Sequence, residues 1–192
     1  MNARPKHLGW IFSFGVLTAL LAMPTSAAAQ RSLFFEETAS AFWAVPYRCA
    51  DGSVVQGTLL VQTTRDFESP DTEDADPTAR KQFQAVCPDG SSFSWFGVVP
   101  ATITSTKNLK TVAASGSGIV TDNLGGTHEV SFDVTWTAVG PLVTTVNASG
   151  SKRLQREAVA TGEVIFDGEV LVDGAADHPT RPAPSIRVDT EK

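Results

Sequence analysis

Cysteine, histidine and tyrosine are scarce in this chain of 192 residues. It contains two cysteines, three histidines and one tyrosine. A structural zinc site takes about four ligands, mostly cysteine and histidine, so few combinations in this chain could supply one. The cysteines, Cys49 and Cys87, are also too far apart in sequence for a redox C-x-x-C motif. These scarcities argue against zinc binding and thiol–disulfide exchange.

Recognisable catalytic and cofactor motifs are missing as well. The sequence has no phosphate-binding loop and no dinucleotide fingerprint. The stretch Ala114–Gly118 lacks the G-x-S-x-G spacing of a serine hydrolase. His128 and Glu129 are neighbours on a predicted strand, so they point to opposite faces and form no local acid–base pair. Two carboxylates brought together only by the fold remain an open arrangement for a glycosidase.

Long apolar runs are limited to one, near the start of the chain. Leu8–Met23 follows the basic residues Arg4 and Lys6 and precedes a small-residue stretch that ends at Ala29. This order predicts a secretory signal peptide over 1–29, with cleavage near Ala29. The run is shorter than the roughly 20 residues that span a bilayer, so we expect no stable membrane insertion after cleavage. The mature protein is predicted to be secreted or periplasmic.

Basic residues are outnumbered by acidic ones. The chain has 15 lysines and arginines against 21 aspartates and glutamates, a formal net charge of −6. A negative surface repels nucleic acid and anionic lipid headgroups. Nucleic acid is therefore excluded as an expected partner, no cofactor is indicated, and the charge names no ligand.

The sequence has no long stretch with the periodicity of a helix. Several segments instead show a strict alternation of apolar and polar residues. In 128–138, polar residues alternate with the apolar residues Val130, Phe132, Val134 and Trp136. Turn signals recur about every eight to twelve residues, which is typical of an antiparallel all-β fold. We predict a single antiparallel meander of about 9–10 strands, curled into a β-barrel or a β-sandwich. The polar stretch Lys152–Glu157 is the one short helical candidate.

The extent of this alternation of apolar and polar residues predicts the domain boundaries. It predicts an all-β domain over 30–176, because strand-like segments and turns succeed one another throughout that range. The segment 177–192 contains three prolines, at positions 179, 182 and 184. Proline lacks a backbone donor, so we expect an extended C-terminal extension there.

The two cysteines open nearly identical phrases. Cys49-Ala-Asp-Gly-Ser53 and Cys87-Pro-Asp-Gly-Ser91 each end a predicted strand and begin an Asp-Gly turn. Two lone cysteines in an exported protein commonly pair. We therefore predict a Cys49–Cys87 disulfide that joins two matched turns.

Two sets of side chains are candidates for binding. Aromatic residues on the apolar strand faces would line an interior pocket or simply fill the core, and the ligand-binding candidates are Trp43, Tyr47, Trp95 and Trp136. An acidic loop over 66–77 offers weak calcium candidates, which are Asp71, Glu73, Asp74 and Asp76. The loop lacks the D-x-D-x-D-G calcium pattern, so a solvated spacer is the simpler interpretation.

Two phrases of the second half resemble a known kind of protein. Asp133–Leu142 contains W-T-x-x-G-P-L, and Ala158–Val164 reads A-x-A-T-G-x-V. Both resemble phrases in exported bacterial β-rich proteins of uncharacterised function. The resemblance implies export and a β architecture, and it carries no catalytic residue to this chain.

Together these features predict an exported, non-enzymatic β-domain that binds a small apolar ligand or a component of the cell envelope. Two alternatives stay open. One is a secreted hydrolase whose acidic residues meet only in the fold, and the other is a structural envelope-associated protein.

Overall fold

The computed structural model describes residues 34–67, 77–106, 108–148, 150–178 and 180–191. The predicted signal peptide and the calcium candidates Asp71, Glu73, Asp74 and Asp76 lie outside these residues. Contacts divide the chain into the units 1–30 and 31–192, and the fold below is that of the second unit.

The described residues form eleven strands and no helix, and thus no helix that could cross a membrane. All pairings are antiparallel, and they join the strands into one sheet. The all-β class and the antiparallel arrangement are confirmed. The strands are β1 (Phe34–Arg48), β2 (Val54–Phe67), β3 (Thr78–Val86), β4 (Ser92–Pro100), β5 (Thr102–Ser105), β6 (Thr111–Asp122), β7 (Thr127–Ala138), β8 (Val143–Val146), β9 (Lys152–Phe166), β10 (Glu169–Ala175) and β11 (Ser185–Glu191).

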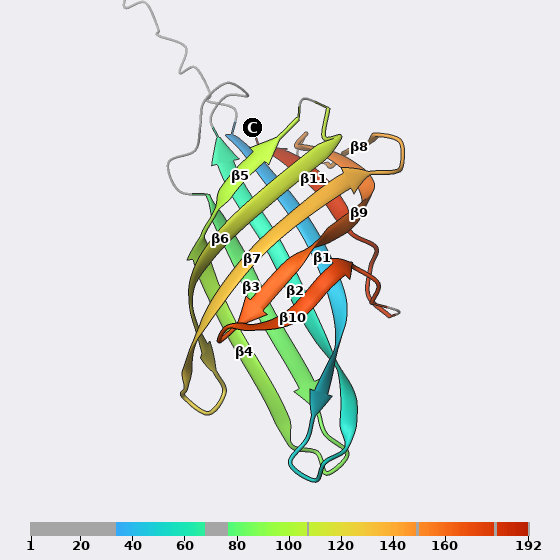
Figure 1. Cartoon of the computed structure of the whole chain (residues 1–192). Coiled ribbons are helices and arrows are strands. Elements are labelled where there is room, and N and C mark those ends of the chain that lie inside the picture. Colours follow the sequence, from blue (N-terminus) through green and yellow to red (C-terminus); the bar gives the residue numbers. More distant parts are fainter. Residues whose placement is uncertain (1–33, 68–76, 107, 149, 179, 192) are drawn as a thin grey trace, which may run out of the picture. The chain divides into compact units, whose positions relative to one another are not determined.

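The sheet curls into a ring without becoming a barrel (Figure 1). Strands β1 to β4 pair in sequence order, as a meander predicts, and β6 and β7 form a further hairpin. β4 meets β6 through only two residue pairs, Trp95 with Asp122 and Phe96 with Thr121. We call this short junction the β4–β6 seam.

The long strand β9 closes the other side of the ring by pairing with four strands. Its first residues lie between β8 and β11, with Arg153 opposite both Thr145 and Asp189. From Ala158 onward it pairs with β7 on one edge, and from Thr161 onward it also pairs with β10 on the other edge. This strand includes the stretch 152–157, the helical candidate of the sequence, which is extended here because both of its edges are paired.

The C-terminal segment contributes a strand instead of an extension. Residues 185–191 form β11, which lies between β1 and β9. Ile186 and Val188 are buried, whereas Arg187 and Asp189 alternate with them and are half-exposed. The prolines of the segment stop before this alternation begins, so they do not remove any donor from the strand.

Twin turns close the β1–β2 and β3–β4 hairpins. In each, the cysteine N–H donates to the carbonyl of the serine four residues later at 2.8 Å, and both Gly52 and Gly90 have φ of 86°. Asp51 accepts bonds from Ser53, and Asp89 accepts the same bonds from Ser91. Glycine adopts this left-handed conformation without strain, as in three-residue hairpin loops.

The predicted disulfide joins these turns. Cys49 and Cys87 are bonded, with their Cα atoms 6.0 Å apart and a separation of 38 positions along the chain. Both side chains are buried. The bond therefore ties two hairpin ends that pair with each other only through β2 and β3.

We expect the double variant Cys49→Ser/Cys87→Ser to lose about 4 kcal/mol of unfolding free energy, because the bond closes a long loop in the unfolded chain. Urea denaturation of both proteins measures the difference. Wild type treated with reductant should match the variant, and a reduced wild type that is as stable as the oxidised protein would contradict this account.

Candidate functional site

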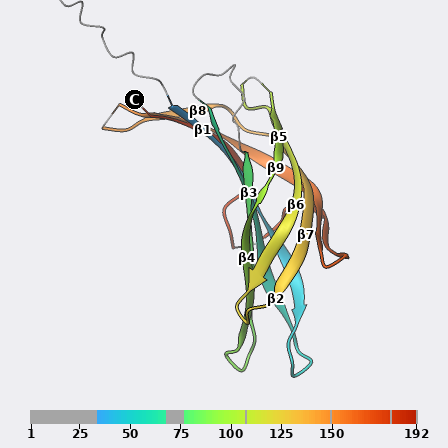
Figure 2. The same cartoon turned by 90° about the vertical axis from the view of Figure 1, so that its left-hand side faces the viewer.

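Two hairpins project beyond the ring at the end that carries the twin turns, which we call the turn end. β1 pairs with β11 only as far as Ser40, and its remaining residues pair with β2 alone. β4 meets no strand but β3 before the seam begins at Trp95. Figures 1 and 2 show the β1–β2 and β3–β4 hairpins extending past the other strands. Since no strand lies opposite, side chains must cover the inner face of this part.

Aromatic side chains provide that cover. We call Tyr47, Phe83, Phe93, Trp95 and Phe166 the aromatic row. Tyr47 stacks on Phe93 with ring centroids 5.4 Å apart, and Phe83 lies about 6 Å from each of Tyr47, Phe93 and Trp95. Trp95 then stacks on Phe166 at 5.2 Å. Such pairs contribute roughly 0.5–1.5 kcal/mol each beyond the burial of their area.

A glycine on β2 makes room for the middle of this row. A Cβ atom at Gly57 would lie 2.5 Å from the ring of Phe83. Any other residue at this position would push the Phe83 ring away from Tyr47 and Phe93. The backbone of β2 thus lets the ring lie flat against the sheet.

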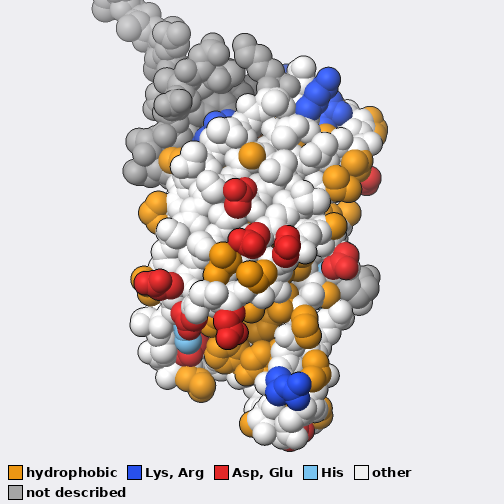
Figure 3. Space-filling view, viewed as in Figure 1, with side chains coloured by type: hydrophobic (Ala, Val, Ile, Leu, Met, Phe, Trp, Pro, Cys, Tyr) orange, Lys and Arg blue, Asp and Glu red, His pale blue; other side chains and the backbone are white. Residues whose placement is uncertain are grey.

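The aromatic row reaches the surface. Phe83 and Trp95 are buried, whereas Tyr47, Phe93 and Phe166 are only half-buried, as are Val55 and Leu171 near them in the apolar cluster. Figure 3 shows hydrophobic side chains gathered on this face, above the hairpin that ends the molecule. Partly exposed rings that are fixed by buried ones form a ready surface for an apolar ligand.

The four aromatic residues selected from the sequence separate into two groups. Tyr47 and Trp95 belong to the aromatic row. Trp43 is buried and donates its indole N–H to the carbonyl of Gly174 at 3.3 Å, which ties β1 to β10. Trp136 is fully buried, and its indole nitrogen has no hydrogen-bond partner among the described residues.

Phe83 and Phe166 were missed by sequence reasoning. Phe83 shares the alternation of the selected residues, so its inward position was detectable. Phe166 precedes the tight turn at Asp167, and only the closure of the ring by β9 brings it onto Trp95. No local pattern signals that contact.

His128 lies at the edge of the aromatic row, between two carboxylates. Its Nε2 is 2.9 Å from Asp122 and its Nδ1 is 2.7 Å from Asp167, and its ring stacks on Phe166 at 4.6 Å. A carboxylate only accepts hydrogen bonds, and the protonated imidazole, which has a donor on each ring nitrogen, satisfies both contacts. Asp122 ends β6 and Asp167 follows β9, so this histidine clamp joins the β6–β7 turn to the β9–β10 turn.

The clamp shifts the pKa of all three groups. Hydrogen bonds to Asp122 and then Asp167 raise the pKa of His128 above its ordinary 6.5. The bond from His128 is in turn the main cause that lowers the pKa of each aspartate below 3.8. All three groups are therefore charged at pH values above the lowered pKa values of the aspartates and below the raised pKa of His128.

Lys81 is the one fully buried cation of the described core. It occupies an inward position on β3, between Val61 of β2 and Gly97 of β4, and its side chain is 0 % exposed. Nζ donates to the carbonyl of Val130 at 3.4 Å and lies 4.4 Å from the centre of the Phe132 ring. Burial lowers the pKa of the ammonium to about 8.

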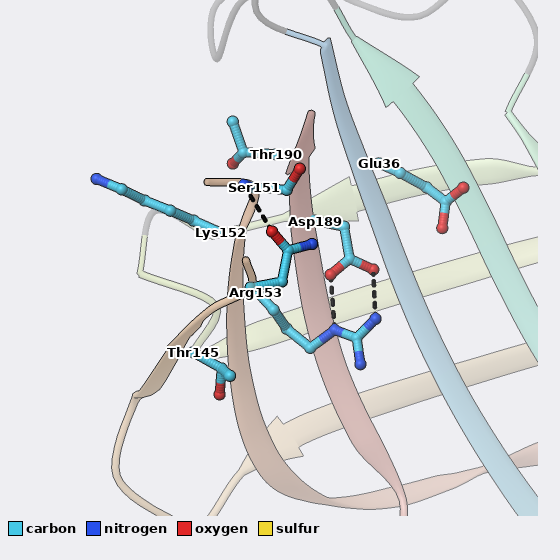
Figure 4. Close-up of a pocket in the computed structure, with 8 residues that line it drawn as sticks. Glu36, Thr145, Ser151, Lys152, Arg153, Asp189 and Thr190 are labelled. Atoms are coloured by element: carbon cyan, nitrogen blue, oxygen red, sulfur yellow. Dashed lines mark hydrogen bonds and ion pairs between the residues drawn. The ribbon is translucent and has the colours of Figure 1, made fainter. Parts of the chain in front are cut away.

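A polar recess of about 440 Å³ lies at the opposite end of the ring (Figure 4). Glu36, Thr145, Lys152 and Thr190 line it together with the ion pair of Arg153 and Asp189, whose Nε and Oδ1 are 2.7 Å apart. Figure 4 shows Lys152 extending away from that pair. The recess is open and polar, so it suits hydrated groups better than an apolar ligand. No group of three or more potential metal ligands occurs among the residues that the structure describes.

Stability should fall as pH rises through the raised pKa of His128, because the folded state binds that proton more tightly than the unfolded state. It should also fall as pH drops through the lowered pKa values of the aspartates. We expect His128→Gln to flatten both slopes in thermal unfolding measured across pH. Glu129→Gln, the next residue on the opposite face, should keep the wild-type profile, and an unchanged profile in His128→Gln would contradict the clamp.

Replacing Lys81 with methionine should stabilise the protein by about 2–3 kcal/mol at pH 7, since a buried cation without a carboxylate is removed. In wild type the unfolded state keeps the lysine proton above pH 8, so stability should rise with pH towards 10.5. Lys81→Met should lose that rise, as urea denaturation at several pH values would show. The exposed Lys110→Met is the control, and a destabilised Lys81→Met would contradict the prediction.

Comparison of the chain with family models, with curated proteins and with solved structures finds no match.

Proposed function

We propose that this chain is an exported, non-enzymatic binding domain that takes a small apolar ligand on the aromatic row. The observation that carries the proposal is the series of ring contacts from Tyr47 through Trp95 to Phe166, buried at its centre and half-buried at its ends. A ligand with a flat apolar face would extend this stacking at the exposed rings. Covering apolar area contributes roughly 25 cal/mol per Å², and rigid rings lose little conformational entropy on binding.

Two features support export. The disulfide between Cys49 and Cys87 is compatible with a periplasmic or extracellular location, where thiols are oxidised. The order of charged, apolar and small residues over 1–29 fits a cleaved leader. An apolar ligand outside the cytoplasm needs a carrier or receptor with a sheltered apolar surface.

A hydrolase is less well supported by the contacts of His128. A general base needs a ring nitrogen with a free lone pair close to the proton that it removes. Both nitrogens of His128 donate to carboxylates at 2.9 and 2.7 Å. The geometry suits a clamp that fixes Phe166 beside Trp95, which serves a binding surface.

We expect the purified protein to bind naphthalene-2-methanol, a neutral flat probe, in isothermal titration calorimetry. Phe93→Ala should weaken binding about tenfold or more, because it removes a half-exposed ring of the aromatic row. Phe96→Ala is the matched control, since Phe96 lies on the outer face of the same strand, beneath the guanidinium of Arg80.

Thermal unfolding should show that both variants remain folded at the temperature of the titration. Equal loss of affinity in Phe93→Ala and Phe96→Ala would contradict the proposed site. Absence of binding to wild type would contradict the proposed function.

A further inference from the structure

Lys81 lies one inward position behind the aromatic row. Along β3 the next inward residue towards the turn end is Phe83, and along β4 the partner of Lys81, Gly97, follows Trp95 in the same way. Its acceptor, the carbonyl of Val130, belongs to the residue that pairs with Phe166. The ammonium is therefore adjacent to the Trp95–Phe166 contact at the inner end of the row.

The side chain of Lys81 also runs beneath the β4–β6 seam. It starts beside Gly97 on β4 and ends at Val130, whose partner on β6 is Gly118. The buried side chains of Val120 and Val99 pack onto Gly97 and Gly118. A recess of about 190 Å³ lies on the outer face over this junction, lined by Phe96, Thr121 and Asp122 among others. Two residue pairs form the seam, and Asn123, just after β6, adds hydrogen bonds to Ser92 and Ser94 of β4.

The ammonium has fewer partners than its burial requires. It has three N–H donors, and its contacts among the described residues are one bond of 3.4 Å and the ring of Phe132. No carboxylate of the described residues forms an ion pair with it, whereas Arg65 pairs with the buried Glu37 at 3.0 Å and Arg153 pairs with Asp189. A buried cation is retained at a large cost in desolvation unless an anion compensates it.

We propose that Lys81 binds the acidic group of the ligand, so that the natural ligand is an apolar carboxylic acid whose hydrophobic part lies on the aromatic row. The carboxylate supplies the missing acceptor, and the half-buried rings cover the apolar part. This inference rests on the proposed function and narrows it to one ligand class. Burial lowers the pKa of Lys81 to about 8 when no acid is present, which agrees with a cation that awaits its counter-ion.

The test compares two probes of the same shape, naphthalene-2-carboxylate and naphthalene-2-methanol, by isothermal titration calorimetry at pH 7. Wild type should bind the acid about tenfold or more tightly than the alcohol, since a charge-assisted hydrogen bond in a buried site is among the stronger ones. In Lys81→Met, which should fold at least as well, both probes should bind equally. Lys152→Met, which removes the exposed lysine of the polar recess, should keep the full preference.

Equal affinity of wild type for the two probes, with both bound, would overturn the role of Lys81 and leave the apolar site standing. A preference that survives in Lys81→Met or vanishes in Lys152→Met would place the acid elsewhere and overturn it too. Failure of both probes to bind wild type would overturn the proposed function together with this inference.

Discussion

The structure depends on one strand that serves four neighbours. β9 pairs with β8 and β11 over its first residues and with β7 and β10 over its last ones. A sheet must bury its apolar face, and this diagonal strand completes a ring that does so for most of the chain. β11 begins at Ser185, which pairs with both Ser40 of β1 and Glu157 of β9, so β1 pairs with β2 alone beyond Ser40.

Aromatic packing and the disulfide together stabilise the part of the sheet that lacks a further strand. Stacked rings fill the space that a strand would otherwise occupy, and the disulfide holds the two hairpin ends that carry them. The histidine clamp fixes the far side, because it joins two turns and places a charged imidazole against Phe166. A partly exposed apolar surface of this kind is commonly a place of contact with another molecule.

Buried charge distinguishes the interior of this ring from an ordinary apolar core. Glu37 and Arg65 compensate one another near the end opposite the twin turns, and Arg65 also donates to Ser105 of β5 at 2.8 Å. No carboxylate among the described residues forms an ion pair with Lys81. One fold therefore holds a compensated cation and an uncompensated one, and the uncompensated one lies at the inner end of the aromatic row.

Local pattern was sufficient for much of this architecture. Alternation located β7 and placed Trp136 inward, and the repeated C-x-D-G-S phrase predicted both the twin turns and the bond between them. Alternation also held the signal for Lys81, which shares its face of β3 with Ala79 and Phe83. A lysine is almost never fully buried unless it is paired, so alternation alone does not mark Lys81 as a core residue.

The pairing of strands that are distant in sequence could not be predicted from local patterns. The C-terminal β11 was placed outside the domain because prolines dominate the segment, although the alternation of Ile186 and Val188 follows them. The contacts of Trp95 with Phe166, and of His128 with Asp122 and Asp167, require the ring to close. Nothing within one strand specifies which distant strand will lie beside it.

Tyr47 permits the most direct measurement of the central claim, because it is the one tyrosine of the chain and ends the aromatic row. Protein labelled with ¹³C in the tyrosine ring gives a single set of ring resonances in an NMR titration with naphthalene-2-carboxylate. The account predicts that these resonances shift with saturating ligand and show nuclear Overhauser contacts to its ring protons. A ligand that binds while the Tyr47 resonances stay unchanged and show no such contacts would contradict it.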